Sequence, residues 1–175
     1  NGVSLDDSLG PVLDWKKPPA PARITLAGRS VRLEPLDPPR HGADLYQASH
    51  GPGVDPKLWL YLTNGPFADE AAFRAWLDGA AKTADPLFFA VIDQKTGRAV
   101  GMMSYMRITP DHGSIEIGNI WFGPSVQRSP VSTEATYLLA RHVFDELGYR
   151  RLEWKCNALN MPSREAALRF GFSYE

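Results

Sequence analysis

The chain has 175 residues, of which 43% are hydrophobic and 22% are charged, a composition typical of one globular domain. Its formal net charge is −1, so it lacks the basic excess that binding to nucleic acid or an anionic membrane requires. No apolar run approaches the roughly 20 residues of a membrane helix. Cys156 is the one cysteine, which excludes an intramolecular disulfide and favours a reducing, cytoplasmic location.

The N-terminal part, residues 1–28, is predicted to be an extended arm ahead of a domain spanning residues 29–175. Prolines recur in this part and hydrophobic periodicity is weak. Trp15 is the residue expected to hold the arm against the domain. A disordered tail is the alternative interpretation.

The first half of the domain contains one strand pattern and two helix patterns. Val31–Leu36 alternates in polarity and predicts a strand that lies at an edge or ends at Pro35, because proline donates no ladder hydrogen bond. Helices are predicted over residues 38–49 and 69–83 from prolines at the start of the first and the helical spacing of apolar residues in the second.

Two aromatic residues, Trp59 and Tyr61, stand between these helices in a segment punctuated by glycine and proline. They are interpreted either as the lining of a substrate pocket or as a cover for the core.

Strand patterns dominate the second half of the chain. Turn signals at residues 93–98 and 110–113 indicate antiparallel hairpins, whereas the later strand–helix–strand order indicates parallel pairing. The prediction is therefore an α/β domain with a mixed, mostly antiparallel sheet flanked by helices. Its predicted strands span 87–92, 99–108, 114–122, 151–158 and 172–175, and its helices span 133–147 and 160–171.

The stretch from Glu116 to Ala135 runs from an apolar strand through a short polar loop into a helix. Backbone N–H groups at a helix N-terminus have no intrahelical partner and bind anions. Hydroxyl groups of Ser129, Ser132 and Thr133 are expected to add donors at the same place. The alternative is an ordinary helix cap that binds nothing.

This loop resembles the acetyl-coenzyme A pyrophosphate loop of the GNAT N-acetyltransferase superfamily, which reads Q/R-x-x-G-x-G/A. Residues 127–132 fill its six places, with Gln127 matching the first. Pro130 replaces the glycine at the fourth place and Ser132 the glycine or alanine at the sixth. Pro130 removes one amide donor, and its fixed φ suits the start of a helix.

A second motif, N-x-x-S followed by a short helix and G-F, occurs at the family's separation as Asn160, Ser163, Gly171 and Phe172. With E-I-G and T-E-A it is most similar to the branch containing ribosomal-protein-alanine acetyltransferases. The resemblance covers the chain from about Ser30 onward. The family adds one more strand after G-F, so the last strand is expected to be missing, and the sheet edge left open would favour a homodimer.

The resemblance implies acetyl-CoA as co-substrate and no metal. Backbone N–H groups at residues 120–122, where the strand is expected to bend near Gly123, would stabilise the oxyanion. The cofactor contacts it implies are Ile120, Trp121, Phe122, Gln127, Arg128, Ser129, Val131, Ser132, Thr133 and Asn160.

Glu116 is the predicted general base, because it lies on the strand beside the expected acyl group; an exposed or ion-paired Glu is the alternative. Many relatives place an acidic Tyr four residues before the glycine of G-F, but this chain has Ala167 there. The resemblance to the ribosomal-protein branch assigns the acid to Ser163 instead.

The predicted function is transfer of an acetyl group from acetyl-CoA to a primary amine by direct attack in a ternary complex. The acceptor is a small amine or the N-terminus of a peptide or protein. An α-amine, with a pKa of about 7.7–8.0, is more often neutral than a lysine at about 10.4, and only the neutral amine attacks. Pro130 and Ala167 keep a second interpretation open, a non-catalytic acyl-CoA sensor or interaction module.

Overall fold

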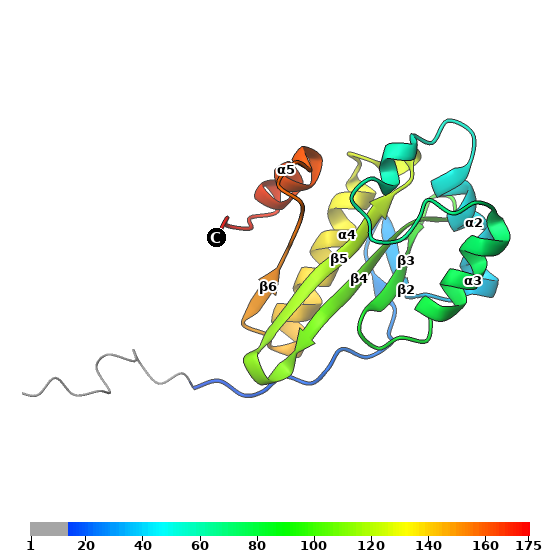
Figure 1. Ribbon diagram of the computed structural model, residues 1–175. Coiled ribbons are helices and arrows are strands. Elements are labelled where there is room, and N and C mark those ends of the chain that lie inside the picture. The colour runs from blue at the N-terminus through cyan, green and yellow to red at the C-terminus, as the bar shows by residue number, and fades with distance from the viewer. Residues whose placement is uncertain (1–13) are drawn as a thin grey trace, which may run out of the picture.

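Residues 14–175, the part described by this computed structural model, form a six-stranded sheet in which strands neighbour one another in chain order (Figure 1). Neighbouring strands are antiparallel except β5 and β6, which are parallel, so the predicted mixed, mostly antiparallel sheet is confirmed. The strands are β1 (Leu26–Ala27), β2 (Val31–Pro35), β3 (Leu87–Asp93), β4 (Ala99–Thr109), β5 (Ser114–Phe122) and β6 (Arg151–Glu153). The helices are α2 (Pro38–His50), α3 (Glu70–Ala80), α4 (Pro130–Arg141) and α5 (Met161–Arg169), with the short 3-10 turns η1 (Pro56–Trp59), η2 (Pro110–His112) and η3 (Pro124–Val126).

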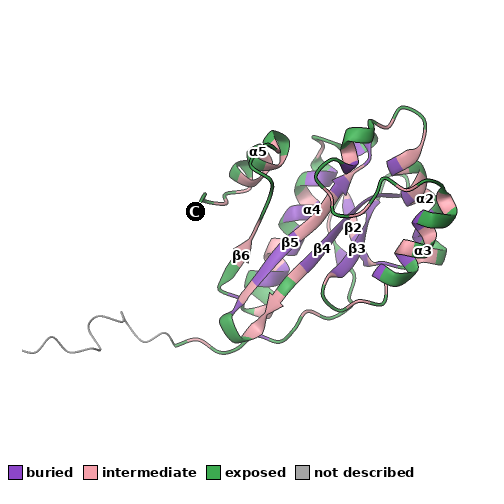
Figure 2. Cartoon of the chain, in the orientation of Figure 1, coloured by how far each residue is buried: buried purple, intermediate pink, exposed green. Residues whose placement is uncertain are grey.

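The sheet has a core on each face, because successive strand residues point to opposite sides. Phe89 and Val91 of β3 belong to the cluster packed against α4, whereas Phe88, Ala90 and Ile92 belong to the cluster packed against α2 and α3. The central strands are accordingly buried along most of their length, whereas α5 has no buried residue (Figure 2). The helix α5 is thus held at the side of the sheet rather than by the core.

Helix starts follow the capping chemistry of the sequence. Asp37 and Asp69 accept hydrogen bonds from backbone N–H groups in the first turns of α2 and α3. The helix α4 begins at Pro130, three residues before the predicted start at Thr133, since proline suits the first helical position. Its continuation, η4 (His142–Leu147), is a π-helix that ends at Gly148 with φ +80°.

Two predicted strands and one part of the predicted arm need correction. The predicted strand 151–158 ends at Glu153, and residues 172–175 form no strand, although the Arg151 guanidinium binds the Glu175 carboxylate. Side-chain contacts therefore bring the end of the chain beside β6 without a backbone ladder. Within the predicted arm, Leu26–Ala27 pairs with β2 as β1, so the sheet starts before residue 29.

Trp15 holds the N-terminal segment against the residues that precede β6, as expected. The part of the predicted arm before residue 14 lies outside the described residues. The indole N–H of Trp15 donates to Gly148 O over 3.4 Å. The Arg150 guanidinium lies 5.5 Å from the Trp15 ring centroid, in cation–π geometry.

A buried carboxylate, Glu34, joins β2 to α2. It is 5% exposed and accepts hydrogen bonds from Arg32 Nε over 2.6 Å and His41 Nε2 over 3.0 Å, with Arg40 completing an ion pair at 2.9 Å. His41 Nδ1 accepts from the Asp37 N–H, so Nε2 carries the proton. Burial alone would raise the pKa of Glu34, but the bonds from Arg32 and His41 and the charge of Arg40 outweigh it and lower the pKa.

Replacing Glu34 by glutamine is expected to destabilise the fold by about 1.5–3 kcal/mol at pH 7, the range for a hydrogen bond to a charged group. A lowered pKa stabilises the fold above the unfolded value, and this contribution disappears as the pH falls. The difference in unfolding free energy between wild type and variant should therefore shrink below the ordinary pKa of 4.5. Urea unfolding at pH 7 and pH 4 measures it, with surface Glu70→Gln as the control expected to change stability by less than about 0.5 kcal/mol. A difference that grows toward acid pH would contradict the assignment.

Candidate active site

A cleft opens where β5 and β6 separate. The two strands pair over only three positions, ending with Glu116 opposite Glu153, and the chain then leads away to α5 (Figure 1). Beyond this point β5 has no strand partner on that side within residues 14–175. The resulting cleft encloses about 900 Å³ between β5, the segment after η1 and the segment from Trp154 to α5.

A β-bulge bends β5 inside this cleft. Gly118 lies opposite Ser104 and Trp121 opposite Met102, so Asn119 and Ile120 share one partner position. Asn119 has φ +51°, and its side-chain amide donates to Ser104 Oγ over 2.9 Å. The strand ends at Phe122 and Gly123 caps the turn η3, so the bulge is a further bend that the sequence analysis did not predict.

The loop from Gln127 to Ser132 closes one end of the cleft. Gln127 Nε2 donates to Phe122 O over 2.9 Å, while Arg128 is exposed with φ +53°. Ser129, the N-cap of α4, makes no side-chain capping bond to the first-turn N–H groups of the helix. This end of α4 therefore presents backbone donors and one cation, a combination that suits a phosphate group.

Two of the three hydroxyl groups that were expected to add donors, those of Ser129 and Ser132, bond to backbone carbonyls of the chain instead. Ser129 Oγ donates to Val126 O over 2.6 Å and Ser132 Oγ donates to Ser129 O over 3.0 Å, so each hydroxyl proton is engaged with backbone. Val131 is buried in the core, and Thr133 lines a separate surface hollow. The expected cofactor residues that do line the cleft are Ile120, Trp121, Phe122, Gln127, Arg128, Ser132 and Asn160.

Glu116 is buried and ion-paired at the closed end of the cleft. Its Oε2 accepts from Arg107 over 2.7 Å and from Lys155 over 2.9 Å. Its Oε1 has no hydrogen-bond partner among the described residues. Hydrogen bonds with Glu153 and then Glu116 raise the pKa of Lys155, which keeps this ammonium charged. One carboxylate oxygen is thus fixed by two cations, while the lone pairs of the other are left without a bond from the residues described.

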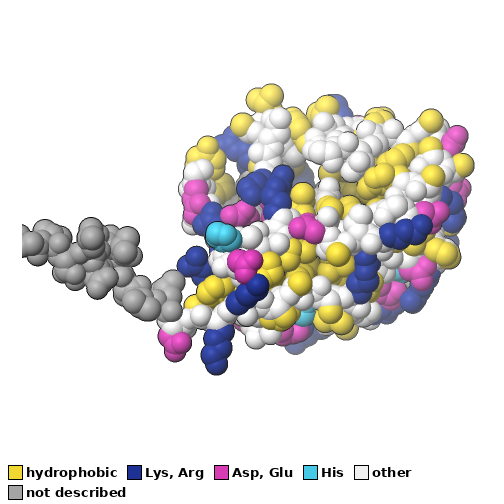
Figure 3. All heavy atoms as spheres, turned by 60° about the horizontal axis from the view of Figure 1, so that its bottom comes forward, with side chains coloured by type: hydrophobic (Ala, Val, Ile, Leu, Met, Phe, Trp, Pro, Cys, Tyr) yellow, Lys and Arg dark blue, Asp and Glu magenta, His cyan; other side chains and the backbone are white. Residues whose placement is uncertain are grey.

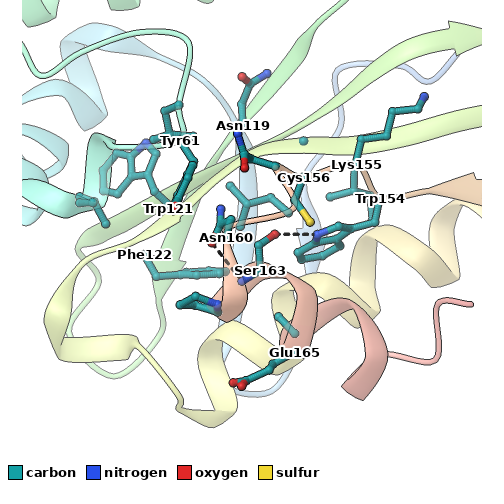
Figure 4. Close-up of a pocket in the computed structure, with 18 of the residues that line it drawn as sticks. Tyr61, Asn119, Trp121, Phe122, Trp154, Lys155, Cys156, Asn160, Ser163 and Glu165 are labelled. Atoms are coloured by element: carbon teal, nitrogen blue, oxygen red, sulfur yellow. Dashed lines mark hydrogen bonds between the residues drawn. The ribbon is translucent and has the colours of Figure 1, made fainter. Parts of the chain in front are cut away.

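Ser163 lies in the first turn of α5 and is fixed by two contacts (Figure 4). Its backbone N–H donates to Asn160 Oδ1 over 3.2 Å, and its Oγ accepts from Trp154 Nε1 over 2.9 Å. Asn160 therefore acts as the N-cap of α5 through its oxygen. Both Ser163 and Asn160 line the cleft.

The two aromatic residues considered for the substrate pocket have different positions. Tyr61 lines the cleft, and its hydroxyl donates to Leu159 O over 3.2 Å across the opening. Trp59 is 4% exposed, packs edge-on against Phe67 and donates to Ser49 O, so it belongs to the core and not to the cleft lining. The size of Trp59 favours burial once its N–H has a partner.

Sequence reasoning missed Arg107, Trp154 and Lys155 as parts of this site. Arg107, with φ +45°, comes from β4, and the other two come from the segment that leaves β6. Lys155 is 39 residues from Glu116 in the sequence, so no local pattern links them.

Charges of both signs are interspersed over the face drawn in Figure 3.

Among residues 14–175 no group of three or more His, Cys, Asp or Glu side chains could hold a metal ion. In the same part of the chain, no helix has the length and apolar character that crossing a membrane would need.

Comparison with known proteins defines the family. A family model described as Acetyltransferase (GNAT) domain matches residues 31–173. A GCN5-related N-acetyltransferase from Brucella melitensis has a TM-score of 0.89 and 48% identity, with 93% of this chain and 73% of that one covered. A probable GNAT-family acetyltransferase from Chromobacterium violaceum has a TM-score of 0.86 and 39% identity, with 95% and 82% covered. A ribosomal-protein-serine acetyltransferase of Escherichia coli K12 is 33% identical over 81 residues, which are 46% of this chain and 45% of that protein.

The chain belongs to the GNAT acetyltransferase family, as the family match over residues 31–173 shows. It matches less than half the length of the curated relative from Escherichia coli, and resembles the ribosomal-protein acetyltransferase branch at modest identity.

Proposed function

We propose that this protein transfers an acetyl group from acetyl-CoA to a primary amine by direct attack in a ternary complex. The observation that carries the proposal is the separation of β5 from β6 after Glu116, which places a carboxylate, a β-bulge and a helix N-terminus along one cleft. The loop at Arg128 and the start of α4 would bind the pyrophosphate. Backbone N–H groups on the unpaired side of β5 would stabilise the oxyanion.

In this mechanism Glu116 accepts the proton that the amine loses on attack, through Oε1. Ser163 gives a proton to the departing sulfur. Residues 60–63 and Leu159 enclose the acceptor side, with the Tyr61 hydroxyl bridging the two walls. Enclosure excludes bulk water and so protects the thioester from hydrolysis.

The acceptor we propose is the α-amine of a peptide or protein N-terminus. An α-amine is roughly a tenth neutral at pH 7, whereas a lysine is neutral far less often. The partial similarity to a ribosomal-protein-serine acetyltransferase supports the same class of acceptor. A small free amine would bind in the same cleft and is the competing substrate class.

The test is calorimetric titration of acetyl-CoA into the protein, followed by mass spectrometry of acceptors with acetyl-CoA present. Matched peptides would carry either a free N-terminus and no lysine, or a blocked N-terminus and one lysine, beside a panel of small amines. Acetylation of the free N-terminus supports the proposal. Acetylation of small amines alone would reassign the acceptor, and binding without any turnover would favour a non-catalytic sensor.

A further inference from the structure

The indole of Trp154 is placed to control the hydroxyl of Ser163. Trp154 follows β6 directly, and its N–H donates to Ser163 Oγ over 2.9 Å (Figure 4). Its ring centroid lies 5.9 Å from that of Phe170 and 5.6 Å from that of Phe172, so aromatic packing holds the indole in place. The Asn160 cap fixes the backbone of Ser163 from the other side. The position of this oxygen is therefore set by two separate segments.

This bond leaves the hydroxyl proton of Ser163 available. A hydroxyl group has one proton to donate and two lone pairs that accept. Trp154 occupies a lone pair, and no bond donated by Ser163 Oγ occurs among the described residues. A donor directed at Oγ also stabilises the negative charge that grows on this oxygen as its proton leaves.

We propose that Trp154 is a positioning residue that holds Ser163 as the proton donor to the departing sulfur, an inference that rests on the function proposed above. The amine nitrogen forms a bond to the thioester carbon, and the carbon–sulfur bond breaks with its electron pair going to sulfur. The Ser163 proton moves to sulfur and the amine proton moves to Glu116; solvent then takes the proton from Glu116 and returns one to Ser163. Trp154 touches neither reacting atom and acts only through Oγ.

A double-mutant cycle separates this role from simple packing. Trp154→Phe keeps an aromatic ring for packing against Phe170 but loses the N–H, and should lower kcat roughly tenfold with KM for acetyl-CoA within about twofold. Ser163→Ala should lower kcat roughly 100-fold, as loss of a general acid does. The double variant should be no slower than Ser163→Ala, because the indole then has no hydroxyl to hold.

Trp76→Phe is the matched control, since Trp76 on α3 packs against Phe73 and against Phe88 of β3 and does not line the cleft. Its kcat should equal that of wild type. The indole N–H resonance of Trp154, assigned by its loss in Trp154→Phe, should shift in Ser163→Ala while the other indole resonances remain. This spectrum also shows that each variant is folded.

Three outcomes would overturn the positioning role. The first is a wild-type kcat in Trp154→Phe, and the second is an equal loss of kcat from Trp154→Phe in the wild-type protein and in Ser163→Ala. The third is an effect of Trp154→Phe on KM alone. Full turnover in Ser163→Ala would remove the acid role and with it the role of Trp154, but would leave acetyl transfer standing. A wild-type protein that acetylates no amine would instead refute the proposed function and the positioning role together.

Discussion

Replacing Glu116 by glutamine should lower kcat for acetyl transfer by roughly 10²–10⁴-fold, the contribution of a positioned general base, and should leave the Kd for acetyl-CoA within about twofold. Glutamine keeps the shape of the side chain but cannot take the proton that the attacking amine loses. The loop proposed to bind the pyrophosphate lies beyond Phe122, at the other end of β5, so cofactor affinity should not follow kcat. Single-turnover acetylation and calorimetry measure the two quantities separately.

A loss of folding stability should not account for the lower kcat of Glu116→Gln. The partners of Glu116, Arg107 and Lys155, have side chains that are 57% and 55% exposed, so both cations regain water when the carboxylate is lost. Glu153→Gln is the matched control. Glu153 is the other carboxylate that binds Lys155, and it does not line the cleft. It should keep kcat within about threefold of wild type. Undiminished turnover in Glu116→Gln would take Glu116 out of the mechanism.

The fold was predictable where chemistry is local. The apolar run of β3 and the turn signals beside it specify strands to within two residues, because burial on both faces and turn residues leave few alternatives. The start of α4 at Pro130 lies three residues before its predicted place, because proline suits the first helical position. The family motifs indicated the loop and Asn160, and residues of both line the cleft.

The site was less predictable, because its geometry depends on distant contacts. Residues 151–158 alternate as a strand should, yet pairing stops at Glu153. The next residue, Trp154, bonds to Ser163 on α5. The ion pairs of Glu116 come from β4 and from beyond β6, and only the register of the sheet brings them together. Trp59 and Tyr61 share one segment, and packing decides that the first is buried while the second faces the cleft.

Arg128→Glu should weaken acetyl-CoA binding roughly 100-fold, because it loses a charge-assisted hydrogen bond and adds repulsion at the end of α4. Arg128 is exposed and has no ion-pair partner among the described residues, so its loss costs the fold little. Lys82→Glu makes the same change of charge at an exposed position after α3, outside the cleft lining, and should leave Kd within about twofold.

A comparison of two ligands shows which part of acetyl-CoA Arg128 contacts. S-acetylpantetheine carries the thioester and the pantetheine arm but no pyrophosphate, so Arg128→Glu should leave its affinity unchanged. Wild-type binding of acetyl-CoA should weaken as salt is raised, and the variant should show a smaller dependence, because screening acts on the pairing that it lacks. Equal weakening of both ligands would place Arg128 beside the pantetheine arm instead. Unchanged affinity for acetyl-CoA would mean that the pyrophosphate is bound by the backbone N–H groups at the start of α4 alone, despite the donor that Pro130 removes.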